Sequence, residues 1–190
     1  MRAYLITSML FIFLLSACNF PRPGQPDPGL TVEPDAGLST ETETPQDFTP
    51  TECGYVWARE SLPDLSKDFK DALQEVQPQA DGYAEAYGEN CMDSQGNAVR
   101  FLAMETDFYI TLKVNDLEDK QALGEWIEQV MAVVAKFPVG DTPGPQPGYV
   151  GITFKAPGDE LRLWFTQTGA ETALENGLQG EELFNALQTK

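Results

Sequence analysis

Histidine is absent from all 190 residues, and only three cysteines are present. The lack of histidine removes the commonest general base at neutral pH, the Ser-His-Asp and Cys-His catalytic arrangements, and the usual zinc sites. The chain also lacks a P-loop, a dinucleotide-binding glycine motif, a G-x-S-x-G turn, a C-x-x-C pair and an EF-hand loop. We therefore expect no cofactor and no dedicated metal or catalytic residues, and we favour a non-enzymatic function.

Basic residues are also scarce. Twelve Lys and Arg stand against 30 Asp and Glu, which gives a formal net charge of −18 at pH 7. Binding to nucleic acid depends on basic side chains that neutralise phosphates, so nucleic acid is not an expected partner. Charge of this sign also gives little attraction to anionic lipid surfaces. It is typical of a domain that is kept soluble after export.

The first 18 residues have the order of a secretory signal peptide. Arg2 is followed by 15 residues without a charge, Ala3 to Ala17, and then by Cys18. A transmembrane helix needs about 20 apolar residues, and this apolar run ends earlier, in Pro-rich polar chain. We expect residues 1–17 to be removed rather than to remain as a membrane span.

The residues at the end of this leader, Leu15-Ser16-Ala17-Cys18, resemble the lipobox of bacterial lipoproteins. The resemblance covers the leader alone. It implies that Cys18 carries lipid and anchors the protein to the cell membrane or the outer membrane, facing outside the cytoplasm. Two or more acyl chains make such an anchor stable, because each buried methylene contributes about 0.8 kcal/mol. An ordinary signal peptide with a chance cysteine is the alternative.

The two remaining cysteines, Cys53 and Cys91, form an even pair once Cys18 is assigned to lipid. A disulfide between them is allowed outside the cytoplasm. It would close a loop of nearly 40 residues. We expect a stabilisation of about 4 kcal/mol from the chain-entropy model of disulfides.

The composition changes at residue 53. Residues 19–52 contain seven prolines, seven carboxylates and one basic residue, and too few large apolar residues to bury a core. We interpret residues 18–52 as the lipidated cysteine and a disordered linker. Residues 53–190 have the length of one domain with a single hydrophobic core.

Hydrophobic periodicity predicts the elements of this domain. Three- and four-residue spacing of apolar residues predicts helices from Ser61 to Pro78 and from Asn115 or Asp116 to Pro138. Alternation predicts strands at 53–59, 81–91, 102–114, 150–154 and 161–165, and two short helices complete the chain. The order is strand, helix, hairpin, helix, hairpin, helices. We predict an α+β fold in which helices pack on one face of an antiparallel sheet.

Two carboxylates in the longest predicted strand are candidates for chemistry. Glu105 and Asp107 are two residues apart, so they project from the same face, near Glu85 and Glu89 of the neighbouring strand. Such a face can hold a general acid and base or oxygen ligands for Ca²⁺. A solvated strand face carries the same alternation of charge. All three interpretations stay open from the sequence.

The face opposite the helices is also expected to be rich in aromatic residues. Aromatic rings with interleaved polar groups can recognise a glycan or a protein, although tyrosine and tryptophan favour strands whatever their function. The loop 140–148 is long enough to form a rim or lid, or a simple connection. We assign Trp57 and Trp126 to the core. Residues of one parity compose the candidate binding face: Tyr109, Tyr149, Trp164, Lys155 and Arg162, with Phe101, Tyr83 and Tyr87.

The sequence therefore favours a lipid-anchored, extracytoplasmic binding or interaction module of the cell envelope, with an envelope protein or a glycan as its ligand. One alternative is a carboxylate-dependent hydrolase of an envelope or extracellular polymer that uses Glu105 and Asp107. Another is a structural domain stabilised by Ca²⁺.

Overall fold

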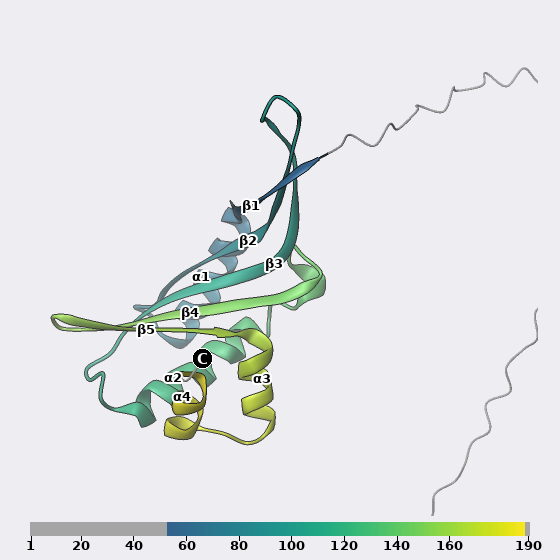
Figure 1. Cartoon of the computed structure of the whole chain (residues 1–190). Helices are drawn as coiled ribbons and strands as arrows, with labels where there is room; N and C mark the ends of the chain where they lie inside the picture. The colour runs from purple at the N-terminus through teal and green to yellow at the C-terminus, as the bar shows by residue number, and fades with distance from the viewer. Residues whose placement is uncertain (1–52, 189–190) are drawn as a thin grey trace, which may run out of the picture. The chain divides into compact units, whose positions relative to one another are not determined.

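A computed structural model describes residues 53–188, which belong to one compact unit. The predicted signal peptide, the lipid site Cys18 and the predicted linker lie outside the described residues. Ten elements follow one another in Figure 1: β1 (Gly54–Ser61), α1 (Pro63–Val76), β2 (Asp81–Met92), β3 (Ala98–Lys113), α2 (Lys120–Val134), the short 3-10 helix η1 (Val139–Asp141), β4 (Gln146–Ala156), β5 (Asp159–Thr166), α3 (Gln167–Glu175) and α4 (Gly180–Gln188).

The five strands form one sheet in the order β1-β2-β3-β4-β5. Three neighbouring pairs are antiparallel, but β3 and β4 run parallel. The predicted α+β domain is confirmed, whereas the prediction of an antiparallel sheet is wrong. The reason is the connection between β3 and β4. It contains α2, and a strand that returns through a helical crossover pairs in parallel.

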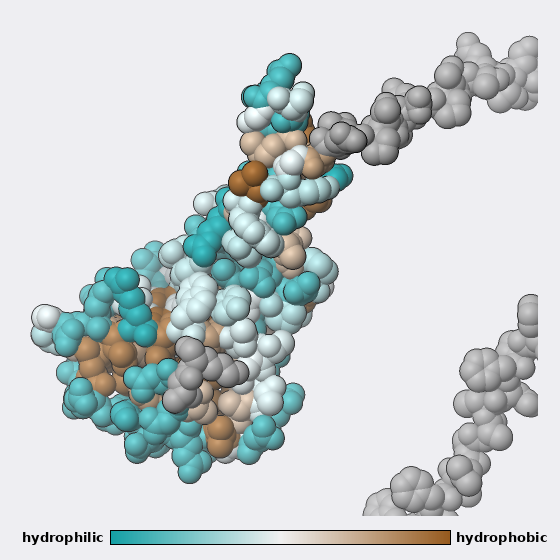
Figure 2. All heavy atoms as spheres, viewed as in Figure 1, coloured by the Kyte–Doolittle hydropathy of each residue, from teal (hydrophilic) through white to brown (hydrophobic). Residues whose placement is uncertain are grey.

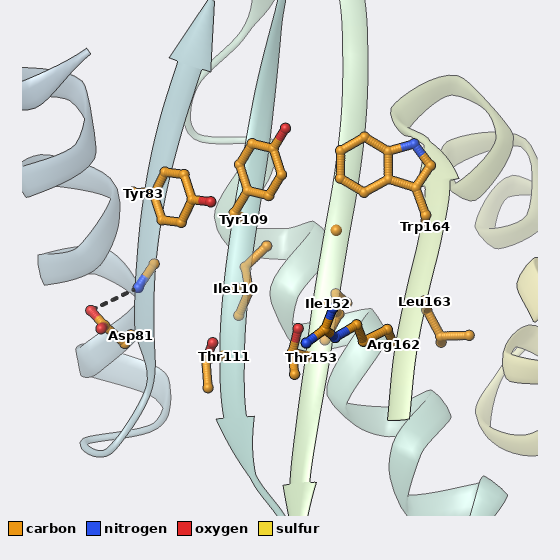
Figure 3. A pocket seen from close by; sticks show the side chains of 12 residues that line it. Asp81, Tyr83, Tyr109, Ile110, Thr111, Ile152, Thr153, Arg162, Leu163 and Trp164 are labelled. Atoms are coloured by element: carbon orange, nitrogen blue, oxygen red, sulfur yellow. Dashed lines mark hydrogen bonds between the residues drawn. The ribbon is translucent and has the colours of Figure 1, made fainter. Parts of the chain in front are cut away.

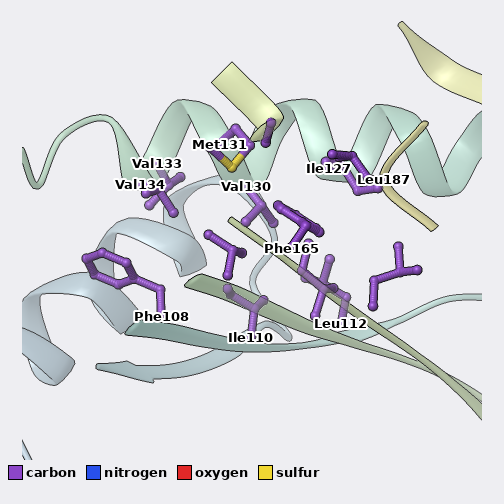
Figure 4. Close-up of a cluster of buried hydrophobic side chains, with 14 of the residues drawn as sticks. Phe108, Ile110, Leu112, Ile127, Val130, Met131, Val133, Val134, Phe165 and Leu187 are labelled. Carbon is purple, nitrogen blue, oxygen red and sulfur yellow. The ribbon is translucent and has the colours of Figure 1, made fainter. Parts of the chain in front are cut away.

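The hydrophobic core lies between one face of the sheet and the helices. Figure 4 shows α2 above the sheet, with Phe108, Ile110 and Leu112 of β3 directed toward it. Both Phe108 and Leu112 are 1% exposed. The core also contains buried apolar residues from α1, α3 and α4. Among residues 53–188, no helix is long and apolar enough to cross a membrane.

The long helices begin at different kinds of residue. α1 begins at Pro63, where proline is tolerated because the first amide of a helix has no acceptor within the helix. α2 begins later than the sequence predicts. Its cap is Asp119, whose side chain accepts the Ala122 N–H at 3.1 Å, and not Asn115 or Asp116.

β1 and the adjoining ends of β2 and β3, residues 86–92 and 98–103, form an arm of the sheet. Figure 2 shows hydrophobic residues among hydrophilic ones on its surface. Trp57 is 58% exposed, so its predicted place in the core is wrong, whereas Trp126 does pack against the core as a partly buried residue. A disulfide joins Cys53 and Cys91 across the arm, with Cα atoms 5.0 Å apart.

A β-bulge changes which residues of β3 face the helices. Tyr87 lies opposite Glu105, but the next residue, Gly88, lies opposite Ala103, so Met104 is the extra residue. Beyond the bulge, Leu102 lies opposite Glu89 and shares its face. The single parity predicted for the strand therefore does not hold, and Phe101 leaves the candidate binding face.

Candidate functional site

Aromatic side chains cross the sheet on the face opposite the helices. We call this set the aromatic row. Its members come from all five strands: Trp57 of β1, Tyr83 and Tyr87 of β2, Tyr109 of β3, Tyr149 of β4 and Trp164 of β5.

The rings of the aromatic row lie against one another. The centroids of Tyr83 and Tyr109 are 4.7 Å apart with 7° between the ring planes. Trp164 continues the row, at 5.3 Å from Tyr109 and 5.4 Å from Tyr149. Figure 3 shows Tyr83, Tyr109 and Trp164 side by side across the strands. Contacts of this kind hold each ring in one orientation before any ligand arrives.

Gly151 allows Trp164 to reach Tyr109 across β4. It lies between these two residues in the strand register, and a Cβ atom at this position would be 2.5 Å from the indole ring. Any side chain here would displace the indole. Gly151 is thus a residue of the site that acts by having no side chain.

Trp57 and Tyr87 form a separate pair within the aromatic row, and Arg59 connects this pair to Tyr109. Its guanidinium carbon lies 5.8 Å from the centroid of Tyr87 and 6.0 Å from that of Tyr109. It also approaches the Glu85 carboxylate at 3.9 Å. Trp57 stacks on Tyr87 at 5.3 Å. Cation–π contacts therefore extend the row to the edge strand β1.

A hollow of about 430 Å³ lies beside the rings. Its lining comes only from β2, β3, β4 and β5, and includes Tyr83, Tyr109 and Trp164 on one side and Asp81, Thr153 and Arg162 on the other. Small-molecule sites usually measure about 300–1,000 Å³. The hollow is large enough for a small ligand or for one unit of a polymer.

Both predicted carboxylates lie near the aromatic row, but Asp107 is only 2% exposed. Its Oδ1 accepts the Tyr149 N–H at 2.8 Å, and the Tyr109 hydroxyl donates weakly to Oδ2 at 3.5 Å. Gly148 leaves the space for this carboxylate, since a Cβ there would be 2.7 Å from Oδ1. Asp107 thus bridges β3 and β4 beside their register shift, between Thr106 and Phe108.

Burial governs the titration of this region. It raises the pKa of Asp107, although the Tyr149 N–H and the Arg59 charge act in the opposite direction. Burial and the neighbouring Asp107 also raise the pKa of Glu105. Burial, followed by the Asp107 charge, raises the pKa of Tyr109 to about 12. The tyrosine hydroxyl therefore stays protonated at physiological pH and can donate a hydrogen bond.

The other predicted neighbours are placed differently along β2. Glu85 lies opposite Asp107, whereas Glu89 lies opposite Leu102, beyond the bulge. Among residues 53–188, no group of three or more His, Cys, Asp or Glu side chains is placed to hold a metal ion. The calcium hypothesis has no such cluster to rest on in this part of the chain.

Four of the five predicted binding residues lie in the aromatic row or line the hollow, and Lys155 does neither. Tyr109, Tyr149 and Trp164 meet in the aromatic row, and Arg162 lines the hollow. Lys155 is exposed farther along β4, opposite Glu160, and does not line the hollow.

The loop 140–148 is a connection rather than a lid. The Pro143 carbonyl accepts the Thr106 hydroxyl at 2.7 Å, and a Cβ on Gly144 would meet the backbone of Met104. Its last three residues already belong to β4. None of its residues lines the hollow.

Sequence reasoning missed Arg59, Gly151, Thr111 and Thr153 as members of the site. Alternation in β1 already places Arg59 on the same face as Trp57, and this pattern could have found both. Thr111 shares the parity of Tyr109, and Gly151 and Thr153 share that of Tyr149, so alternation could have found them as well. No family model, curated protein or solved structure matches this chain.

Proposed function

We propose that this protein is an extracytoplasmic binding module of the cell envelope, tethered to a membrane by lipid on Cys18. The ligand binds on the aromatic row. One observation carries the proposal. An ordered set of rings spans β2 to β5, beside a hollow lined only by the same strands.

The exposure of these rings supports binding. Trp164 is 42% exposed and Tyr83 is 47% exposed, although each is held by a neighbouring ring. Large aromatic residues dominate the energetics of interfaces because they contribute a large contact area. Rings that are already ordered lose little conformational entropy when a ligand arrives. The surface therefore combines available apolar area with pre-organisation.

The carboxylates give less support to the hydrolase alternative. A general acid or base must come within hydrogen-bonding reach of the substrate. Asp107 is 2% exposed, and its Oδ1 already accepts the Tyr149 N–H. Its carboxylate is better explained as a bridge between strands. Binding is the function that the geometry favours.

The binding proposal is tested by photo-cross-linking on intact cells that produce the full chain. A cross-linker placed beside the hollow should give a specific adduct with an envelope component, and Trp164→Ala should abolish it. Tyr55→Ala is the matched control, because Tyr55 is 52% exposed and lies outside the aromatic row. Equal adduct yields from all three proteins would refute the proposal.

The anchor is tested separately by Cys18→Ala. We expect the unchanged protein to partition with membranes and into detergent, and the variant to be found in the soluble fraction. Acyl chains provide the attachment, because the net charge of −18 gives little attraction to anionic lipid. Membrane partitioning that survives the substitution would overturn the anchor.

A further inference from the structure

The strand register arranges the hollow as two neighbouring rows of side chains. Tyr83, Tyr109, Gly151 and Trp164 are successive partners across β2, β3, β4 and β5. Two residues farther along the same strands, a second set of partners forms what we call the polar row. Its members are Asp81, Thr111, Thr153 and Arg162.

The charges of the polar row already have protein partners. The Asp81 carboxylate lies 2.8 Å from the Lys70 ammonium, and the Arg162 guanidinium pairs with Glu160. Asp81 and Arg162 are the charged residues among the 12 that line the hollow. An ionic ligand would have to compete with an existing ion pair at either end. A neutral ligand would not.

The polar row retains groups that can bind hydroxyls. Thr111 and Thr153 each offer a hydroxyl that donates and accepts, and they lie next to each other in the register. Arg162 has five N–H donors, which are more than its contact with Glu160 uses. Figure 3 shows the Arg162 guanidinium next to Thr153, directed over the sheet.

The hollow is therefore amphipathic, with aromatic rings along one side and hydroxyl-binding groups along the other. A pyranose has matching chemistry, since its C–H groups can pack on aromatic rings while its hydroxyls face polar groups. The inner position of the hollow also disfavours an extended peptide. Of the strands that line it, β2, β3 and β4 are each paired with a neighbour on both sides, and only β5 is an edge strand. A peptide could therefore not add as a new strand within the hollow.

We infer that the hollow binds a sugar unit of a neutral carbohydrate, with Trp164 and Tyr83 as the aromatic contacts and the polar row as the hydroxyl contacts. This inference rests on the proposed binding function and specifies its ligand. The net charge of −18 supports it further, because the chain as a whole repels acidic glycans.

The test titrates the full chain with neutral oligomers of glucose, N-acetylglucosamine, mannose and xylose. Oligomers of galacturonate and of glucosamine serve as acidic and basic counterparts, and an uncharged peptide and trilysine represent polypeptides. The readout is the indole N–H resonance of Trp164 in NMR spectra, assigned with Trp164→Phe. We expect at least one neutral sugar to shift this resonance, and no charged oligomer to do so with higher affinity.

Variants of the two rows make the test specific. Thr153→Val keeps the side-chain shape and removes the hydroxyl, so we expect about 2- to 10-fold weaker sugar binding. Gly151→Ala keeps the indole but displaces it, and should weaken binding at least as much. Gly54→Ala is its matched control, since nothing lies within 4 Å of a Cβ at that position. Far-UV circular dichroism checks that each variant folds.

The outcomes separate the ligand class from the binding function. If charged oligomers or peptides shift the Trp164 resonance and neutral sugars do not, the carbohydrate inference is wrong while the binding module stands. If no compound shifts the resonance, the inference is also wrong, and the cross-linking experiment decides the binding function by itself. Sugar binding that is unchanged in both Thr153→Val and Gly151→Ala would place the ligand elsewhere.

Discussion

At the scale of the residue, Asp107 combines burial with a structural contact. Its carboxylate is 2% exposed and accepts the Tyr149 N–H, and burial raises its pKa above the ordinary value of 3.8. The folded chain therefore holds this proton at pH values where the unfolded chain has lost it. The contribution of Asp107 to the free energy of unfolding therefore falls as the pH rises from about 3.8 through the raised pKa.

We predict that Asp107→Asn makes the free energy of unfolding depend less on pH in this range. The amide oxygen can still accept the Tyr149 N–H, while the cost of a buried charge is removed. Stability at pH 7 should equal or exceed that of the unchanged protein. Urea denaturation at a series of pH values from 3 to 7 measures both effects. Some slope should remain, because the pKa of Glu105 is raised as well.

Two further variants make the Asp107 prediction specific. Asp107→Ala removes the acceptor and should cost about 1–3 kcal/mol, because it leaves the Tyr149 N–H without this partner. Glu171→Gln, which changes an exposed carboxylate far from Asp107 in the sequence, is the matched control. A profile for Asp107→Asn as steep as that of the unchanged protein would contradict the burial argument.

Sequence alone could place Glu105 and Asp107 on one face, because the two-residue period of a strand requires it. It could not predict that Asp107 is buried. That burial depends on the approach of Gly148 and Tyr149 from β4, which are 41 and 42 residues away along the chain. A contact of this kind is set by the pairing of strands, which local patterns do not encode.

At the scale of the element, the start of α2 offers a direct comparison between sequence and structure. Several polar residues precede this helix, and each has the side chain of a good N-cap. The structure selects Asp119, whose Oδ1 accepts the Ala122 N–H. Asp116 instead accepts the Glu118 N–H in the preceding turn.

We predict that Asp119→Ala lowers the free energy of unfolding by about 1 kcal/mol, because the first turn of α2 loses its side-chain acceptor. Asp116→Ala is the matched control and should cost less, since its contact lies outside the helix. Thermal and urea unfolding of the two variants measure the difference. A larger loss for Asp116→Ala would mean that the helix begins where the sequence predicts.

The elements themselves were largely predictable, because each has a clear period. The faces of β3 were not. Its apolar alternation continues through Leu102 and Met104, but the bulge at Met104 reverses the faces beyond it. The parallel pairing of β3 with β4 was also missed, since the two predicted hairpins favoured an antiparallel arrangement and periodicity does not show how they join.

At the scale of the whole molecule, the disulfide connects the start of the described chain to the second strand of the sheet. Cys53 precedes β1, and Cys91, which is 1% exposed, lies near the end of β2. The bond spans a sequence separation of 38. It restricts the unfolded chain and so raises the free energy of unfolding.

We predict that Cys53→Ala with Cys91→Ala lowers the free energy of unfolding by about 4 kcal/mol. Denaturation in urea, followed by circular dichroism, measures this loss. A reducing agent should destabilise the unchanged protein by a similar amount and leave the double variant unaffected. If reduction changes neither protein, the disulfide does not contribute in the way proposed.

The candidate site also belongs to this scale, because it exists only when four strands come into register. Parity correctly grouped Tyr109, Tyr149 and Trp164. Parity also places Gly151, Thr111 and Thr153 on this face, but the hollow depends on which residues lie opposite one another across the strands. No single segment of sequence contains that information.

The position of the disulfide has a mechanical consequence. A pull on the predicted linker would reach Cys53 before it reaches β1. The covalent bond passes the load to Cys91 in β2, a strand paired with a neighbour on each side. Without the bond, the same force would peel the edge strand away one hydrogen bond at a time. In the proposed tether, the load therefore enters the domain at an interior strand and bypasses the edge strand.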